Sequence, residues 1–151
     1  MPTSPTPTLV HNDWRLDNMA VDEHDPARCV AVFDWDMCTV GDPLTDLGTL
    51  LAAWFEPGEN LAFLAAMPSQ VPGFMTRQEA VARYAERSGI DVARVGYYYV
   101  FGLFKLAGVV QQLYFRWHKG QTTDARMAGG EMAAEGLVAL AWQNIEAVPT
   151  A

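Results

Sequence analysis

Two apolar runs beside a short polar motif place the strongest constraint on how this chain folds. Residues 11–18 have the sequence HNDWRLDN, and the apolar runs 19–21 and 29–33 follow them on either side of a turn-forming segment. This pattern predicts a β-hairpin. Because an antiparallel pair brings its two open ends together, we expect Asn18 and Asp34 to face one another.

The first helix signal lies directly after the hairpin. Asp42 precedes Pro43. This pair predicts a helix start, because aspartate caps free N–H groups and proline suits the first helical position. We expect the helix to run to Trp54 and to end before the Pro-Gly pair at 57–58.

Further helix signals continue through the rest of the chain. The sequence TRQE at 76–79 is a capping box, which predicts a helix ending at 88–89. A long helix is expected to start at Asp91 and, being apolar over most of its surface, to form the centre of the core. A last helix over about 124–147 should pack on it. Some glycines in these helices are expected to allow close helix approach: Gly102, Gly108, Gly129 and Gly130.

These elements predict one domain of the α+β class, mainly helical with a small β-hairpin. The chain has 151 residues, 50% of them hydrophobic and 19% charged, which is enough for one substantial core. Residues 1–8 are expected to form a flexible Pro/Thr-rich lead, and residues 9–151 the folded lobe. Within that lobe we expect the motif loop and hairpin over 9–40 and a helical subdomain over 42–148.

The apolar stretch 97–115 approaches the length of a membrane span. It contains Lys105 and the glutamine pair at 111–112, each of which is costly in hydrocarbon. A buried helix in a globular core is therefore the favoured interpretation.

The charge balance argues against polyanionic partners. The net charge is −8 at pH 7, and no block of Lys and Arg offsets it locally. We therefore expect neither a nucleic acid nor a membrane partner. The first third of the chain holds closely spaced acids that suggest either a cation site or a solvated acidic surface: Asp13, Asp17, Asp22, Asp34, Asp36, Asp42 and Asp46.

The cysteines and the amino terminus predict a cytoplasmic protein. Cys29 and Cys38 are too few and too far apart for a disulfide scaffold or a metal knuckle, so we expect free thiols. The first eight residues lack the basic and apolar regions of a secretory signal.

The polar motif supplies the groups that phosphoryl transfer requires. In such reactions a protein positions a hydroxyl, neutralises phosphate charge with magnesium and accepts a proton. Asp13 is the candidate base, which would bind the acceptor hydroxyl and take its proton. Magnesium prefers oxygen ligands and keeps several waters, so Asn18 and Asp34 would suffice together with phosphate oxygens.

Three further residues are expected to support this loop. His11 is expected to hold it by hydrogen-bonding to backbone, as buried histidines commonly do. Arg15 has three candidate partners, namely a phosphate, Asp17 and Asp36, and the sequence does not choose among them. Asp46, in the first turn of its helix, either faces the loop or simply complements the helix dipole.

Other chemistries fit this sequence less well. A Ser-His-Asp hydrolase of the nucleophile-elbow type needs a G-x-S-x-G motif, which is absent, and the three histidines are too scattered for a zinc site. Hydrolysis by paired carboxylates such as Asp13 and Asp34 stays open.

Five segments together resemble the aminoglycoside phosphotransferase (choline kinase-like) family, especially the branch related to kinase-like domains attached to acyl-CoA dehydrogenases. These segments are 9–18, 31–36, 40–47, 102–107 and 114–122. The resemblance covers nearly the whole chain after the lead.

The resemblance implies a protein-kinase-like fold, of which this chain would be the carboxy-terminal lobe. By position, Asp13 matches the catalytic base, Asn18 and Asp34 the magnesium ligands, and His11 the loop histidine. Asn12 stands where a glycine is usual, which is a small departure from the family pattern.

The resemblance also implies ATP as phosphoryl donor, with Mg²⁺, and a small-molecule hydroxyl acceptor. Kinases of this type cover the nucleotide with an amino-terminal β lobe, whereas ten residues precede His11 here. We therefore expect an incomplete kinase that needs such a lobe or a dimer partner. The alternatives are a non-catalytic kinase-like binding module and a metal-dependent phosphohydrolase.

Overall fold

A computed structural model describes residues 6–59 and 68–145 of the chain. In this part of the chain, four α-helices and four short strands are joined by turns and single 3-10 turns. The strands form two separate antiparallel pairs. The predicted class, mainly helical with a small β-hairpin, is confirmed.

The predicted hairpin is one of the two strand pairs. Strand β2 (Met19–Val21) pairs with β3 (Cys29–Val32). The second pair joins β1 (Thr8–Val10) to β4 (Thr39–Gly41) and was not predicted. Each of its strands is three residues long, too short for an alternating pattern, and the partners are far apart in sequence.

Helix α1 (Leu44–Ala52) begins where the Asp42-Pro43 pair predicts it. The Asp42 carboxylate accepts a hydrogen bond from the Leu44 N–H at 2.9 Å, which satisfies one of the free donors of the first turn. The helix ends at Ala52, two residues before the predicted end at Trp54.

Helix α2 (Arg77–Ser88) has both signals that the sequence predicts. The Thr76 and Glu79 side chains each bind the other residue's backbone N–H, which completes the capping box. Gly89 ends the helix with a φ of 70°, a left-handed conformation that glycine adopts without steric cost.

Helix α3 (Val95–His118) begins four residues later than predicted. Asp91 does not cap it, because its carboxylate accepts the Ala93 N–H within a turn that precedes the helix. The start at Asp91 is therefore wrong, although the long helix itself and its central place are confirmed.

Helix α4 (Gly130–Ile145) also begins later than the predicted start at Asp124. Residues Ala125–Gly129 form a 3-10 helix instead. A Cβ atom added to Gly130 would lie 2.8 Å from the Cβ of Tyr114, so this glycine lets α4 lie close against α3. The predicted end of this helix lies outside the described residues.

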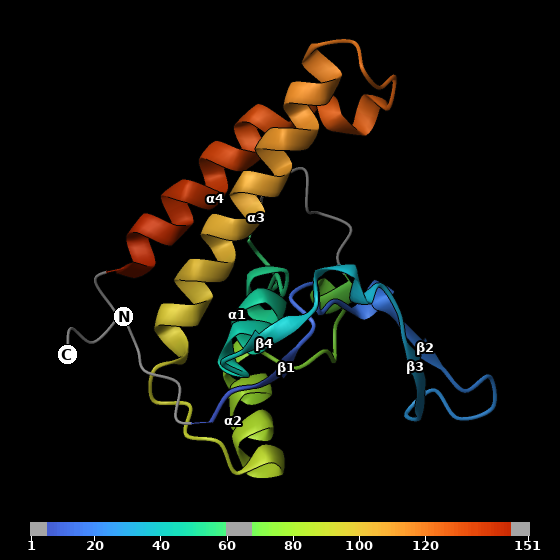
Figure 1. Cartoon of the computed structure of the whole chain (residues 1–151), viewed down its shortest axis with the longest axis vertical. Helices are drawn as coiled ribbons and strands as arrows, with labels where there is room; N and C mark the ends of the chain where they lie inside the picture. The colour runs from blue at the N-terminus through green and yellow to red at the C-terminus, as the bar shows by residue number, and fades with distance from the viewer. Residues whose placement is uncertain (1–5, 60–67, 146–151) are drawn as a thin grey trace.

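Helices α1 to α4 form what we call the helical body. Figure 1 shows α3 and α4 side by side along most of their length, α1 beside the lower half of α3, and the hairpin projecting from the opposite side. Four side chains that are at most 1% exposed mark its centre: Ala52, Phe55, Leu103 and Leu137.

Helices α1 and α3 cross at two glycines with their backbones in contact. A Cβ added to Gly48 would lie 2.2 Å from the Tyr98 carbonyl oxygen, and one added to Gly102 would lie 2.4 Å from the Gly48 carbonyl oxygen. No side chain fits there, so close approach is confirmed at Gly102. A Cβ added to Gly108 or Gly129 would meet open space, so the close helix approach expected at these two glycines is not found.

An ion cluster ties α2 to the chain after α1. The Arg77 guanidinium donates hydrogen bonds to both Glu56 and Glu59 and lies over the Tyr99 ring. Burial disfavours ionised Glu59, but the hydrogen bonds and charge of Arg77 outweigh it, so the pKa of Glu59 lies below its usual value. Charge therefore contributes to the packing of α2.

The structure also bears on two expectations, one about membrane-spanning helices and one about the cysteines. No helix within the described ranges is long and apolar enough to cross a membrane. Cys29 and Cys38 are both exposed and carry free thiols.

Candidate active site

His11 holds the motif loop, which we define as residues 11–18, from a buried position. Its side chain is 1% exposed. Nε2 lies 2.7 Å from the Phe33 carbonyl oxygen, and Nδ1 lies 3.2 Å from the Asp13 amide nitrogen. The carbonyl requires a donor and the amide an acceptor, so these contacts assign the hydrogen to Nε2. His11 thus connects the loop to the end of β3.

Asp46 faces the motif loop from the first turn of α1. Its carboxylate accepts hydrogen bonds from the backbone N–H groups of His11 and Asn12, both at 2.7 Å. Of the two alternatives that the sequence leaves open for Asp46, the structure shows contact with the loop.

Asn12 is fixed on both sides of its backbone. Its φ of 65° is left-handed, which asparagine tolerates better than most residues. Asp46 accepts its N–H, and the Lys105 ammonium of α3 donates to its carbonyl oxygen. Our sequence analysis did not select Lys105 as a site residue. A signal was present, however, since no other charged side chain lies between Val95 and Phe115.

Asp13, the candidate base, is oriented by its neighbours and still reaches solvent. The Asn18 amide donates to the Asp13 carbonyl oxygen at 2.9 Å and to its carboxylate at 3.2 Å. The Arg15 Nε lies 3.5 Å from the other carboxylate oxygen. The side chain keeps 30% exposure, so a hydroxyl group has access to it.

Asn18 and Asp34, the candidate magnesium ligands, lie at adjoining places in the hairpin. The Phe33 N–H donates to the Asn18 carbonyl oxygen at 2.8 Å, which continues the β2–β3 ladder and brings Asp34 beside Asn18. The Asn18 NH2 group is directed to Asp13, so its side-chain oxygen is left for another partner. Within the described residues the Asp34 carboxylate accepts no hydrogen bond.

This donor set fits magnesium in its chemistry. A carboxylate and an amide oxygen are hard ligands, and magnesium takes its other ligands from water and phosphate. In the ranges 6–59 and 68–145 there is no group of three or more His, Cys, Asp or Glu able to hold a metal. A cage made of protein side chains alone is therefore not what this part of the chain offers.

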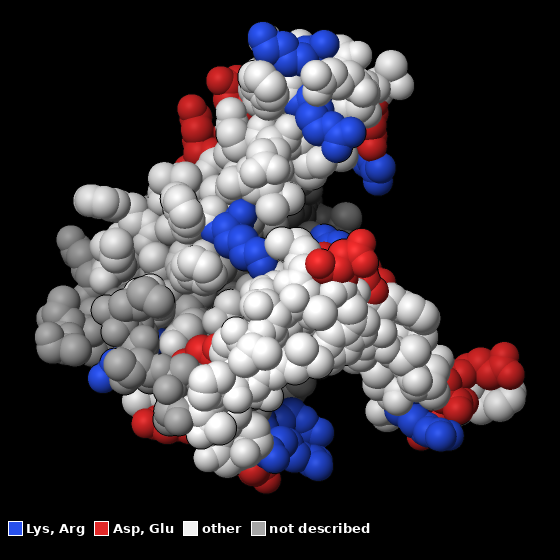
Figure 2. All heavy atoms as spheres, viewed as in Figure 1, with Lys and Arg blue, Asp and Glu red and all other residues white. Residues whose placement is uncertain are grey.

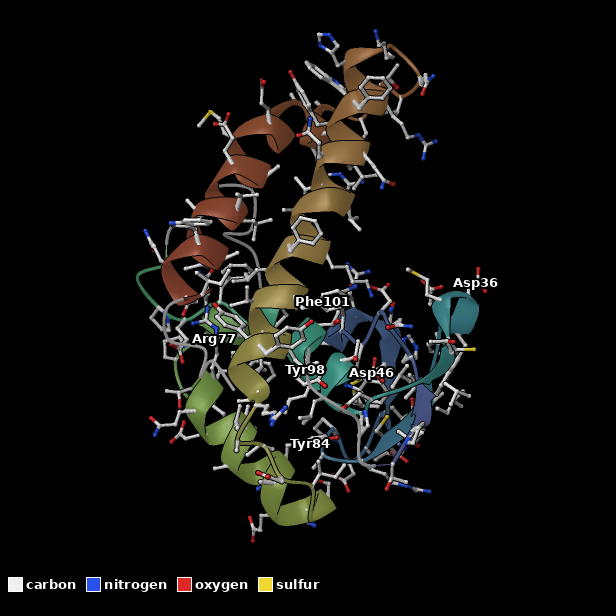
Figure 3. The ribbon with its side chains drawn as sticks, turned by 60° about the vertical axis from the view of Figure 1, so that its left-hand side comes forward. Asp36, Asp46, Arg77, Tyr84, Tyr98 and Phe101 are labelled. Carbon is white, nitrogen blue, oxygen red and sulfur yellow. The ribbon has the colours of Figure 1, made fainter. Side chains whose placement is uncertain are left out.

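Arg15 pairs within its own loop. Its guanidinium contacts Asp13, and its terminal nitrogen lies 3.3 Å from Asp17. Figure 3 shows Asp36 at the outer edge of the 3-10 turn Trp35–Met37, well away from Asp46 and the centre of the site. Of the protein partners considered for Arg15, Asp17 is in contact and Asp36 is not.

A second contact fixes the start of α1 beside the loop. The Tyr98 hydroxyl of α3 donates to the Asp42 carboxylate at 2.8 Å. Burial and this hydrogen bond both raise the pKa of Tyr98 above its usual value, so the hydroxyl stays a donor. Figure 3 labels Tyr98 on α3 and Asp46 in the first turn of α1.

Several hollows open on the described part of the chain, and one of about 420 Å³ is lined by Trp14 of the motif loop and by Asp46. Another, of about 290 Å³, adjoins the motif loop at 15–17 and is walled by Leu50, Ala53 and Trp54. A larger one, of about 710 Å³, is lined by residues of α3 and α4 only. In Figure 2 charged side chains gather at the upper end of α3, around α2, at the hairpin turn and in a basic and an acidic group at the middle of the face, and the surface between these groups is largely uncharged.

The fold and the arrangement of the motif loop are those of the kinase-like class. The chain belongs to the phosphotransferase enzyme family, whose family model matches residues 1–95.

Known proteins agree with this assignment. Mouse acyl-CoA dehydrogenase family member 10 is 30% identical over 145 residues, and mouse family member 11 is 32% identical over 120 residues. The matches cover 94% and 76% of this chain, but the chain spans only 14% and 15% of the length of those relatives.

A solved structure confirms the fold. The Ralstonia eutropha protein assigned as an aminoglycoside phosphotransferase superposes with a TM-score of 0.77 at 22% identity. The similarity covers 95% of this chain and 44% of the Ralstonia chain. At this level of identity it supports the kinase-like fold and not a substrate.

Proposed function

We propose that the chain carries the catalytic loop of a small-molecule kinase, which transfers the γ-phosphoryl group of ATP to a hydroxyl acceptor. The observation that carries this proposal is the state of Asp13. Its carboxylate is oriented by Asn18 and Arg15 and is still open to solvent. A general base needs both properties, since it must meet the acceptor at hydrogen-bonding distance in a fixed direction.

Each residue of the site has a distinct role in this proposal. Asp13 would accept a hydrogen bond from the acceptor hydroxyl, orient it toward the phosphoryl group and take its proton. Asn18 and Asp34 would hold Mg²⁺, which when bound neutralises phosphate charge. His11 and Asp46 would keep the loop backbone in place through their contacts with Phe33 and with the loop N–H groups.

We also propose that the full reaction draws on parts of the fold outside this chain. The motif loop provides no cover for a nucleotide, and kinases of this fold use a second lobe for that purpose. The support is the length of the Ralstonia protein, of which this chain covers 44%.

Thermal unfolding with nucleotide tests binding. A ligand that binds only the folded state stabilises it by RT ln(1 + [L]/Kd), about 2.7 kcal/mol at a hundredfold excess over Kd. We expect MgATP to raise the melting temperature of the wild type, alone or joined to a nucleotide-covering lobe. Asp34→Asn should reduce this rise, whereas the matched control Asp36→Asn at the edge of the site should keep it.

Turnover tests the role of Asp13. ADP formation with a panel of hydroxyl acceptors should fall by at least a hundredfold in Asp13→Asn, since general-base catalysis contributes about 10²- to 10⁴-fold. Equal ADP formation by wild type and Asp13→Asn would contradict the assigned role.

A non-catalytic binding module is the second candidate, and one observation favours it. Four large apolar side chains on or beside the strands are more than half exposed: Leu9, Val30, Phe33 and Val40. Apolar patches of this kind often mark association surfaces. No melting shift with millimolar MgATP, in the presence of the covering lobe, would favour this candidate over the kinase.

A further inference from the structure

Lys105 is an unusual residue for its helix. No other charged side chain lies between Val95 and Phe115, and its neighbours Leu103 and Ala107 are buried. Lys105 itself is half-buried. Placing an ammonium group against an apolar helix face costs free energy unless the group is hydrogen-bonded. A specific partner for Lys105 is therefore expected.

That partner belongs to the motif loop. The Lys105 ammonium donates a hydrogen bond to the carbonyl oxygen of Asn12, 93 positions earlier in the chain. No carboxylate among the described residues lies within ion-pairing distance of Lys105. Lys105 interacts electrostatically with the carboxylates of Asp13 on the loop and Asp46 on α1.

The two peptide groups of Asn12 are thus held from two different helices. Asp46 of α1 accepts the N–H of Asn12, and Lys105 of α3 donates to its carbonyl oxygen. That carbonyl belongs to the peptide bond joining Asn12 to Asp13. Fixing this peptide plane fixes the position of the Asp13 Cα atom, from which its side chain leaves the backbone.

We propose that Lys105 is a positioning residue for Asp13: it holds the peptide between Asn12 and Asp13 and keeps a positive charge near the motif loop. The catalytic consequence rests on the proposed function, whereas the positioning itself does not. A lysine that served only to fill space would be replaceable by a side chain of the same length without charge.

The first test follows the peptide itself and needs no activity. The ¹³C signal of the Asn12 carbonyl should change with pH as Lys105 loses its proton. Burial lowers the pKa of Lys105, although the Asp13 and Asp46 charges oppose this, so the change should fall below the pH range of exposed lysines. The change should disappear in Lys105→Met, which carries no charge, and also in Lys105→Arg, because arginine does not lose its proton in proteins.

The matched control is Lys119→Met at the end of α3, where the lysine lies over the Phe115 ring. It should leave the Asn12 signal and the exchange rates of the loop amides unchanged. Lys105→Met should accelerate exchange at Asn12 and Asp13. If the wild-type Asn12 carbonyl does not respond to pH in that range, the proposal is overturned, even where Lys105→Met fails to fold.

The second test measures catalysis with the nucleotide-covering lobe present. We expect Lys105→Met to lower kcat by about 10- to 100-fold with little change in the KM for MgATP, since small misplacements of a catalytic group have effects of this size. Lys105→Arg should restore part of kcat. An unchanged kcat in Lys105→Met would overturn the catalytic consequence. Wild-type activity no higher than that of Asp13→Asn would instead refute the proposed kinase function and leave the first test decisive for Lys105.

Discussion

The crossing of α1 and α3 and the motif loop are held together by different kinds of contact. At the crossing, Gly48 and Gly102 bring two backbones together with no room for a side chain. In the loop, the backbone of residues 11–13 is bound by side chains, chiefly by Asp46 from α1 and by His11 of the loop itself. The arrangement of α1 and α3 therefore depends on close backbone packing, whereas the conformation of the motif loop depends on hydrogen bonds from a few polar side chains.

The largest effect should come from filling the crossing. Gly48→Ala places a methyl group against the Tyr98 carbonyl, so the helices must separate, and we expect a loss of about 3 kcal/mol in the free energy of unfolding. Urea unfolding measures this. Gly108→Ala on α3 is the control, because its Cβ meets open space and alanine favours a helix by up to about 1 kcal/mol. Equal changes in the free energy of unfolding for Gly48→Ala and Gly108→Ala would contradict the view that close backbone packing holds the crossing.

A smaller and more local effect should follow from removing the carboxylate that binds the loop. Asp46→Ala leaves the N–H groups of His11 and Asn12 without acceptors, which should cost about 2 kcal/mol. Hydrogen exchange should accelerate at those two amides and not at Leu103 in α3. The exposed Asp36→Ala serves as control. Uniform acceleration throughout the helical body would show that loop and body are one unit.

Low pH should destabilise the helical body by protonating its ion cluster, because the crossing of α1 and α3 contains no titratable group at its two glycines. The pKa of Glu59 is lowered from its usual 4.5, so its contribution to stability is present above that pH and is lost as the pH falls through the folded-state pKa. We expect a decrease of about 1 kcal/mol between pH 6 and 3 that is absent in Glu59→Gln. Denaturant midpoints across this range measure it, and an equal decrease in both proteins would refute the assignment.

The smallest effect should come from the loop residue with the positive φ. Asn12→Gly relieves the left-handed conformation but loses an exposed hydrogen bond to the Met37 carbonyl and adds freedom to the unfolded chain. We expect a net change within about 0.5 kcal/mol, measured by thermal unfolding. A loss above about 1 kcal/mol would mean that the Asn12 side chain, and not its backbone contacts, holds the loop.

Sequence patterns predicted the parts of the fold that depend on neighbours along the chain. The hairpin, the Asp42-Pro43 helix start and the capping box of α2 are local, and all three are confirmed. The β1–β4 pair depends on contacts about thirty residues apart in three-residue strands, and the sequence gives no local sign of it. The starts of α3 and α4 were wrong for a related reason, since aspartates there cap turns before the helices.

The candidate site was predictable in its residues but not in all its contacts. The spacing of His11, Asp13 and Asn18 was enough to predict that these three residues lie together, and the hairpin prediction was enough to place Asp34 beside Asn18. The roles proposed for these residues stay predictions. The contact of Lys105 with Asn12 depends on how α3 lies across α1, which no local pattern specifies.

The glycine crossing also sets how far motion in the helices can reach the loop. Gly48 lies two residues after Asp46, and Gly102 lies three residues before Lys105, so the pivot is roughly 3 to 4.5 Å along each helix from the groups that bind Asn12. A tilt of roughly 5° between the helices shifts the Cα atom of either residue by only about 0.4 Å, because these atoms lie close to the pivot. The backbone positions from which Asp46 and Lys105 reach the loop therefore move little when the two helices tilt about the crossing.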